Sequence, residues 1–108
     1  MIQKTTQSSA DQIDHNFREL PPTQQKIVFA LYTLVHPPEI AVDDLFDLLR
    51  KKFSEEVDVT STAELFYRLK DLLHEGFITL RPVGRRTTIV CGIPSVAKVL
   101  HERQHLAT

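Results

Sequence analysis

The sequence is poor in the residues and runs that mark secreted, membrane or nucleotide-hydrolysing proteins. Its 108 residues include one cysteine, three glycines and no tryptophan. A single cysteine, Cys91, excludes an internal disulfide, and no glycine-rich phosphate loop is present. No apolar run approaches the length of a membrane span, and no basic-then-apolar leader begins the chain. We therefore expect an intracellular chain with no membrane contact and no cofactor.

What is present is the composition of one ordinary globular domain. Hydrophobic residues make up 42% of the chain and charged residues 25%. The net charge of −1 conceals an asymmetry. Residues 1–77 carry 8 basic and 13 acidic side chains, giving −5, whereas residues 78–108 carry 5 basic and 1 acidic, giving +4. Phosphate contact needs local positive charge, so this asymmetry permits weak nucleic-acid binding.

Apolar spacing and proline positions predict the order of the elements. Residues 1–10 are polar and aperiodic, so we predict a disordered tail or linker there and a single domain over residues 11–108. A candidate capping box joins Ser9 to Gln12. A helix is predicted from Asp11, with inner positions Ile13, Phe17 and Leu20, and it breaks at Pro21–Pro22. A second helix is predicted over 23–35, with a core stripe of Ile27, Ala30, Leu31, Leu34 and Val35. An edge strand at 39–42, a helix capped by Asp43 and a polar loop at 54–60 follow.

Residues 61–92 form the most informative unit of the sequence. Ser61 and Glu64 have the spacing of a reciprocal helix cap, and Gly76 stands where a left-handed residue ends a helix. The strands FITLR and TTIVCG then flank the turn PVGRR, and Pro94 begins a last helix. The predicted inner face of the first helix consists of Leu65, Phe66, Leu69, Leu72 and Leu73, and that of the last of Val96, Val99 and Leu100.

This order predicts an α+β, mainly helical fold. It is that of a winged helix, a helix-turn-helix with a C-terminal β-hairpin wing, extended by flanking N- and C-terminal helices. A small helical domain that ends in a basic hairpin usually binds nucleic acid or another protein, and we do not expect an enzyme.

The helix before the hairpin is the expected recognition helix, whose outward face meets the partner. Tyr67, Asp71 and His74 are predicted to point outward, with Arg68 and Lys70 on the shoulders. Arg68 and Lys70 suit backbone phosphates, and Tyr67 suits a phosphate hydrogen bond or stacking. Asp71 would be repelled by phosphates, so we assign Asp71 and His74 to protein docking. The alternative is a solvated helix face without a nucleic-acid role.

The hairpin is the stronger candidate for nucleic-acid contact. Arg81, Arg85 and Arg86 surround Pro82 and Gly84, so three guanidinium groups crowd one tight turn. This pattern predicts contact with phosphates or the minor groove. The alternative is a charged loop that serves only solubility.

A metalloprotease pattern occurs near the end of the sequence. His101, Glu102 and His105 spell HExxH, whose helical spacing suits zinc and a general base. Only three residues follow, so no third ligand comes after the motif, and helix ends fray. We predict neither a metal site nor catalysis here.

The chain from Asp11 onward resembles the carboxy-terminal winged-helix domain of the replication initiators, meaning the largest subunit of the origin recognition complex and its cell-division-cycle relative. The segments that carry the resemblance, over roughly residues 11–100, are ELPPTQQKIVFALYTL, VDDLFDLLRKKF, LKDLLHEGFITL and GRRTTIV. It implies contact with origin DNA through the recognition helix, at Arg68 and Lys70, and through the wing, at Arg85 and Arg86. It also implies contact with the replicative helicase or other initiator subunits.

Two departures from the family qualify what the resemblance implies. Ala63 and Glu64 stand where archaeal relatives tend to carry arginines, so strong helix-mediated affinity is not expected. The Walker A loop of the parent ATPase is missing, which implies an excised domain or a shortened relative unable to hydrolyse ATP alone.

These observations leave three functions open. We expect a DNA-binding and protein-docking module of an initiator, monomeric in isolation and located in a nucleus or, in a prokaryote, in the cytoplasm or nucleoid. The alternatives are a small dimeric winged-helix transcriptional regulator and a winged helix used only for protein interaction.

Overall fold

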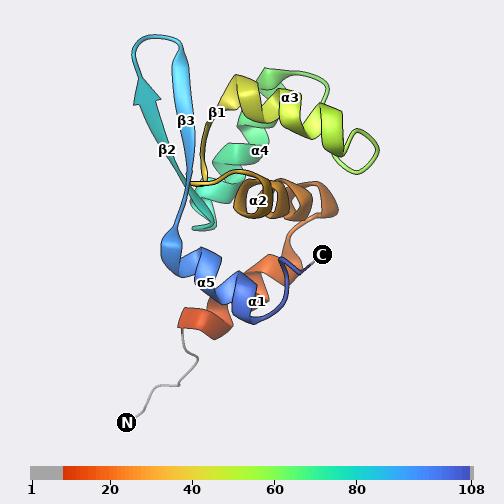
Figure 1. Ribbon diagram of the computed structural model, residues 1–108, viewed down its shortest axis with the longest axis vertical. Coiled ribbons are helices and arrows are strands. Elements are labelled where there is room, and N and C mark those ends of the chain that lie inside the picture. The colour runs from red at the N-terminus through yellow and green to blue at the C-terminus, as the bar shows by residue number, and fades with distance from the viewer. Residues whose placement is uncertain (1–8, 108) are drawn as a thin grey trace.

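The computed structural model describes residues 9–107 and shows an α+β chain in the predicted order of elements (Figure 1). Within this range it has five helices and a three-stranded antiparallel sheet, an arrangement compatible with the predicted winged helix. The elements are α1 (Ser9–Glu19), α2 (Pro22–Leu34), β1 (Glu39–Ala41), α3 (Val42–Lys52), α4 (Thr62–His74), β2 (Ile78–Val83), β3 (Thr87–Gly92) and α5 (Pro94–Glu102).

The first helix begins earlier than predicted. Ser9 and Ala10, which were predicted to belong to the tail, are part of α1, and Ser9 is a helical residue rather than a cap. The rest of the predicted tail, residues 1–8, lies outside the described residues. Among the helices that the structure describes, none is long and apolar enough to span a bilayer.

The sheet has the strand order β1-β3-β2, so β1 is an edge strand as predicted. Leu80 pairs with Val90 and Pro82 with Thr88 in the antiparallel β2–β3 hairpin. Pro82 is tolerated because β2 is the other edge of the sheet, where one side of the strand needs no ladder partner. The strand extends to Val83, so the turn has three residues, 84–86, instead of the predicted five.

Both ends of α4 are satisfied by local hydrogen bonds. Ser61 Oγ accepts from the Glu64 amide at 3.1 Å, as predicted. The Glu64 carboxylate reaches one residue further back than predicted and accepts from the Thr60 amide at 2.8 Å and from the Thr60 hydroxyl at 2.9 Å. Gly76 has φ +85°, and the Gly76 and Phe77 amides donate to the carbonyl oxygens of the last helical turn. This is a Schellman motif, which ends the helix and starts β2.

The caps predicted for α3 and the loop after it differ from the structure. Asp43 is a first-turn residue of α3, and the cap position is Ala41, which makes no side-chain capping bond. Asp43 still favours the helix because a carboxylate near the N-terminus complements the dipole. The loop at 54–60 contributes buried Val57 and Val59 to the core, although it is mostly polar.

The core lies where α2, α3 and α4 pack against the sheet. Each fully buried aliphatic or aromatic side chain contributes about 1.5–3 kcal/mol by leaving water. Leu34, predicted to be buried, is 43% exposed, because Val28 and Tyr32 take its place on the inner face of α2. The largest fully buried side chains are those of Ile27, Val28, Leu31, Leu45, Leu49, Leu65, Leu69, Leu72, Phe77, Ile78, Val90 and Leu100.

Tyr32 ties α2 to the two ends of the hairpin. Its hydroxyl donates to the Phe77 carbonyl oxygen at 2.7 Å and accepts from the Ile93 amide at 2.8 Å. Burial of the phenol raises the pKa of Tyr32. Gly92 lies beside this ring, where an added Cβ would come within 2.7 Å of Tyr32 Cε1. The close approach therefore requires glycine at residue 92.

The end of the molecule opposite the hairpin is closed by α1, α5 and residues 103–107, which we call the α1–α5 end (Figure 1). Asp14 is buried there, with His105 Nε2 2.5 Å from its Oδ1 and Arg18 2.5 Å from its Oδ2. Arg103 bonds Asp11 at 2.7 Å and lies 3.5 Å from Asp14. The hydrogen bond from His105, with the charges of Arg18 and Arg103, holds the pKa of Asp14 below its usual range.

Candidate nucleic-acid interface

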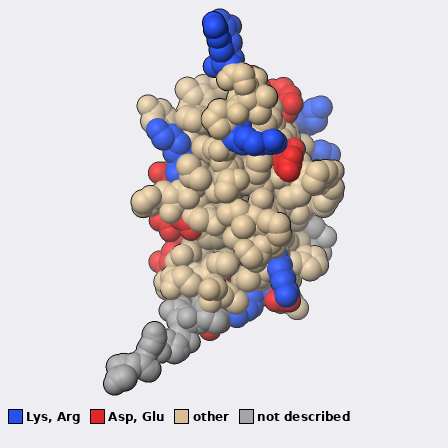
Figure 2. Space-filling view, turned by 90° about the vertical axis from the view of Figure 1, so that its left-hand side faces the viewer, with Lys and Arg blue, Asp and Glu red and all other residues tan. Residues whose placement is uncertain are grey.

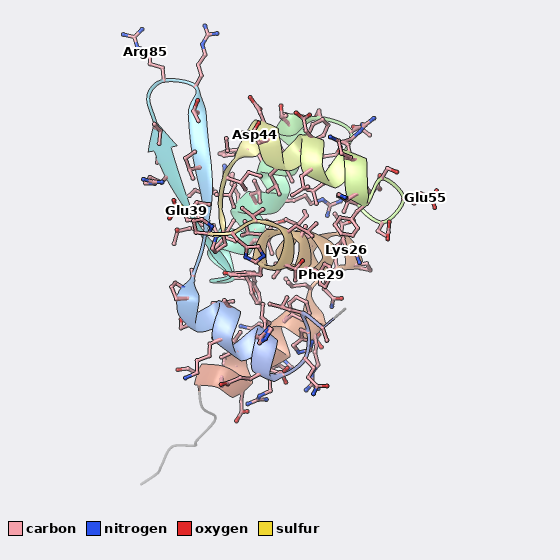
Figure 3. All side chains as sticks on the ribbon, viewed as in Figure 1. Lys26, Phe29, Glu39, Asp44, Glu55 and Arg85 are labelled. Carbon is pink, nitrogen blue, oxygen red and sulfur yellow. The ribbon has the colours of Figure 1, made fainter. Side chains whose placement is uncertain are left out.

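The tip of the β2–β3 hairpin carries two exposed arginines of the sequence-predicted site. Gly84 has φ +71°, the left-handed conformation that a three-residue hairpin turn requires, and it is followed by Arg85 and Arg86. Both arginines are exposed, and neither makes an ion pair or hydrogen bond with any described residue. Arg85 projects from the tip away from the molecule (Figure 3).

Positively charged side chains stand at the hairpin end of the molecule. Viewed from the side of the hairpin, basic side chains stand at the extreme end, beyond a face made mostly of uncharged residues (Figure 2). The strand residues beside the turn are small or apolar, with Val83 47% exposed and Thr87 exposed. The turn itself contains no carboxylate, and Asp43 and Asp44 at the start of α3 line a cleft with Arg86.

Arg81 is separated from the other two hairpin arginines in both position and pairing. It lies three residues before the turn, and its Nη2 is 3.5 Å from Glu39 Oε1 on β1, across β3. Both side chains are more than half exposed, so the pair is worth little in stability. Its effect is electrostatic, because Glu39 offsets part of the positive charge of Arg81.

Arg68 faces away from the hairpin. Its guanidinium donates to Gln24 Oε1 on α2 at 3.4 Å, and the side chain is partly buried. Gln24 is itself buried and gains its partner in this way. The structure therefore does not bring Arg68 together with Arg85 and Arg86 as one contact surface.

Tyr67 and Lys70 share the outer side of α4. Tyr67 is 70% exposed, as predicted for an outward residue. The Lys70 ammonium lies 5.9 Å from the ring centroids of both Phe66 and Tyr67, within the range of cation–π attraction. Lys70 is thus accessible but held against aromatic rings of its own helix.

Asp71 and His74, the predicted docking residues, line the same shallow cleft. The cleft has a volume of about 300 Å³ and lies between the end of α4 and the α1–α2 connection. Glu19 and Glu75 also line it, so its rim is acidic. Phe66 and Leu73 do not line this acidic cleft.

Two residues at this face were predicted wrongly. Phe66 and Leu73 are 36% and 42% exposed, although their spacing predicted the inner face. Leu65, Leu69 and Leu72 fill that face completely, which leaves Phe66 and Leu73 at its margin. Helical periodicity alone does not distinguish the centre of an apolar face from its edge.

The HExxH pattern does not have helical geometry. α5 ends at Glu102, and Gln104 has φ +67°, so His105 lies outside the helix that holds His101. His105 instead contacts Asp14 on α1, and His101 is exposed. Among the described residues, no group of His, Cys, Asp and Glu has an arrangement suited to a metal ion.

The Asp14 cluster is the polar site that sequence reasoning missed. Asp14 and His105 are 91 residues apart, a separation that no local motif reports. One signal was available: Asp14 stands three residues before Phe17 on the apolar side of α1, where a carboxylate needs a buried partner.

Comparison with protein-family models, with curated proteins and with solved structures gave no match for this chain. The resemblance to the replication initiators therefore stays a prediction.

Proposed function

We propose that this chain is a winged-helix module of a replication initiator that binds duplex DNA mainly through the phosphate backbone, with the β2–β3 hairpin as its wing. The observation that carries the proposal is the pair Arg85 and Arg86, which are exposed in a three-residue turn and form no ion pair with any described residue. Guanidinium groups form bidentate bonds with phosphate, and a narrow turn lets them approach it closely.

Base readout contributes little in this proposal. Sequence-specific contact in the major groove needs Arg, Lys, Asn or Gln side chains free on the outward helix face. On α4, Arg68 bonds Gln24 and Lys70 lies against two rings, while Asp71 repels phosphates. Binding should therefore be largely independent of sequence and strongly dependent on salt.

The initiator assignment rests on the resemblance and adds partners to the DNA contact. Other initiator subunits or the replicative helicase would dock on the acidic cleft that Asp71 and His74 line. A parent protein would supply ATP hydrolysis. A duplex-DNA partner implies a nucleus or a prokaryotic nucleoid as the site of action.

A salt titration of duplex affinity tests the proposal. Two phosphate contacts predict that log K falls with log salt at a slope of about −1.8. The double variant Arg85→Ala/Arg86→Ala should lose this dependence and most of the affinity. The control Lys52→Ala/Lys98→Ala removes the same charge from two exposed positions on α3 and α5 and should bind as the wild type does. Equal losses in both variants, or none in either, would contradict wing contact.

The second candidate is a winged helix used only for protein interaction, and the exposed Phe66 and Leu73 of α4 favour it. Such a module would show no appreciable duplex affinity at low or high salt. Sedimentation distinguishes the dimeric regulator from the initiator domain by the oligomeric state, because an initiator domain should be monomeric when it is alone.

A further inference from the structure

A stripe of four residues runs along the outer side of α4, and we call it the α4 stripe: Ala63, Phe66, Lys70 and Leu73. Their positions i, i+3, i+7 and i+10 place them in one row on the helix surface. All four are exposed, Phe66 at 36% and Leu73 at 42%. The row is therefore ordered and accessible on a helix whose inner face is already filled.

This spacing is that of the contact row of one helix packed on another. Apolar residues that alternate at three and four residues present a seam to a facing helix, and helical peptides are bound through such anchors. A single exposed apolar residue needs no explanation. Here an aromatic and a leucine lie two turns apart in the same row, which makes the row a candidate contact surface.

A cleft beside the α4 stripe extends the candidate contact surface towards the hairpin. It has a volume of about 260 Å³ and lies between α4, the start of α3 and β3. Ala63 and Phe66 line one wall, and Thr88 and Arg86 of the hairpin line the other. A helix laid on the stripe would therefore rest against the hairpin as well as α4.

The charges of this surface define what covers it. Lys70 stands in the middle of the stripe, 5.9 Å from the Phe66 ring, and Arg86 lines the cleft. Asp43 is the carboxylate in the cleft, at its α3 side. A partner that covers the stripe removes Lys70 from water, and a buried ammonium without an acidic partner is costly. A second copy of the chain would add a second Lys70 to the contact.

We propose that the α4 stripe binds an amphipathic helix of a protein partner, with apolar residues facing Phe66 and Leu73 and an aspartate or glutamate facing Lys70. This contact does not depend on DNA binding. It also differs from the acidic cleft at Asp71 and His74, which no residue of the α4 stripe lines.

Synthetic helical peptides of about 20 residues test the proposal with the whole chain. They share one leucine seam and differ only in the central seam residue, which is Glu, Gln or Lys. Fluorescence anisotropy should give the tightest binding for the Glu peptide, about tenfold or more tighter than for the Lys peptide. Lys70→Glu should reverse this order, which a nonspecific apolar contact would not do.

Matched variants separate the stripe from the rest of the surface. Phe66→Ser/Leu73→Ser should abolish peptide binding, whereas Leu34→Ser, at a leucine of similar exposure on α2, should not. Circular dichroism checks that each variant is folded. Duplex affinity should stay unchanged in Phe66→Ser/Leu73→Ser, so failure of this proposal is distinguishable from failure of the DNA proposal.

Three outcomes would overturn the inference. Equal affinity for the three peptides, or no binding of any, removes the acidic helix as occupant. A dimer that Leu73→Ser dissociates makes a second copy the occupant. Binding of an oligothymidine strand that is lost in Phe66→Ser/Leu73→Ser makes the stripe a stacking platform for unpaired bases.

Discussion

The two ends of this molecule use their charged residues in opposite ways. At the α1–α5 end, Asp14 is buried and contacts His105, Arg18 and Arg103, so each charge has a partner. At the hairpin end, Arg85 and Arg86 are exposed and unpaired with any described residue. The positive charge of the last third of the sequence therefore divides into a structural part and an available part. Net charge alone does not separate the two.

The largest difference in stability between the two ends should appear when an apolar side chain that packs beside the buried charges is removed. Phe17→Ala should lower the free energy of unfolding by about 3–5 kcal/mol, because this ring is 6% exposed and packs edge-on against Phe77. Val83→Ala at the hairpin is the matched change and should cost less than about 0.5 kcal/mol, since Val83 is 47% exposed. Urea unfolding of both variants measures the difference. Similar losses at the two sites would mean that the ends are equally built for stability.

Acid should weaken the α1–α5 end through Asp14. The pKa of this carboxyl is lower in the folded chain, so its stabilisation is present above the unfolded value of about 3.9 and is lost as the pH falls through the folded value. Asp14→Asn should therefore have a lower melting temperature than the wild type at pH 6, and the gap should narrow towards pH 2. Thermal melts over this range measure it.

An exposed carboxylate serves as the control for the acid effect. Asp47→Asn on α3 removes the same charge from a side chain without an ion pair among the described residues, and its melting curve should follow the wild type. A constant gap between Asp14→Asn and the wild type at every pH would mean that Asp14 acts by packing rather than by charge.

The smallest expected change in stability comes from the turn after α5, which places His105 next to Asp14. The His105 amide donates to the Leu100 carbonyl oxygen, and the Gln104 amide donates to the His101 carbonyl oxygen. These bonds form a second Schellman motif, in which Gln104 has φ +67°. Glycine adopts this conformation without strain, so Gln104→Gly should stabilise the chain by about 0.5–1 kcal/mol. Gly76→Ala, at the same position after α4, should destabilise it by a similar amount. Loss of stability in Gln104→Gly would show that the glutamine side chain matters there.

Much of the fold was predictable because it depends on local rules. Ser61 caps α4, Gly76 ends it, and Pro94 begins α5, as predicted from residue type and spacing. The order of the elements and the edge position of β1 followed from the same signals. Each of these features is decided within a few residues of chain.

What sequence reasoning missed depends on contacts between distant segments. The partner of Asp14 lies 91 residues away, and Glu39 meets Arg81 only because β3 runs between their strands. Val57 and Val59 pack into the core cluster from a mostly polar loop, whose local sequence does not indicate burial. For the candidate site, the accessibility of Arg85 and Arg86 was predictable, whereas the pairing of Arg68 with Gln24 was not.

The Tyr32 hydroxyl described above has an optical consequence. The chain has no tryptophan and two tyrosines, so its intrinsic fluorescence comes from Tyr32 and Tyr67. Both hydrogen-bonding positions of the Tyr32 hydroxyl are occupied inside the fold, whereas Tyr67 is 70% exposed beside the α4 stripe. Tyr32 therefore reports whether the chain is folded, and Tyr67 reports whether α4 is covered. The two tyrosines emit in the same band, so the single variants Tyr32→Phe and Tyr67→Phe separate their signals without any added dye.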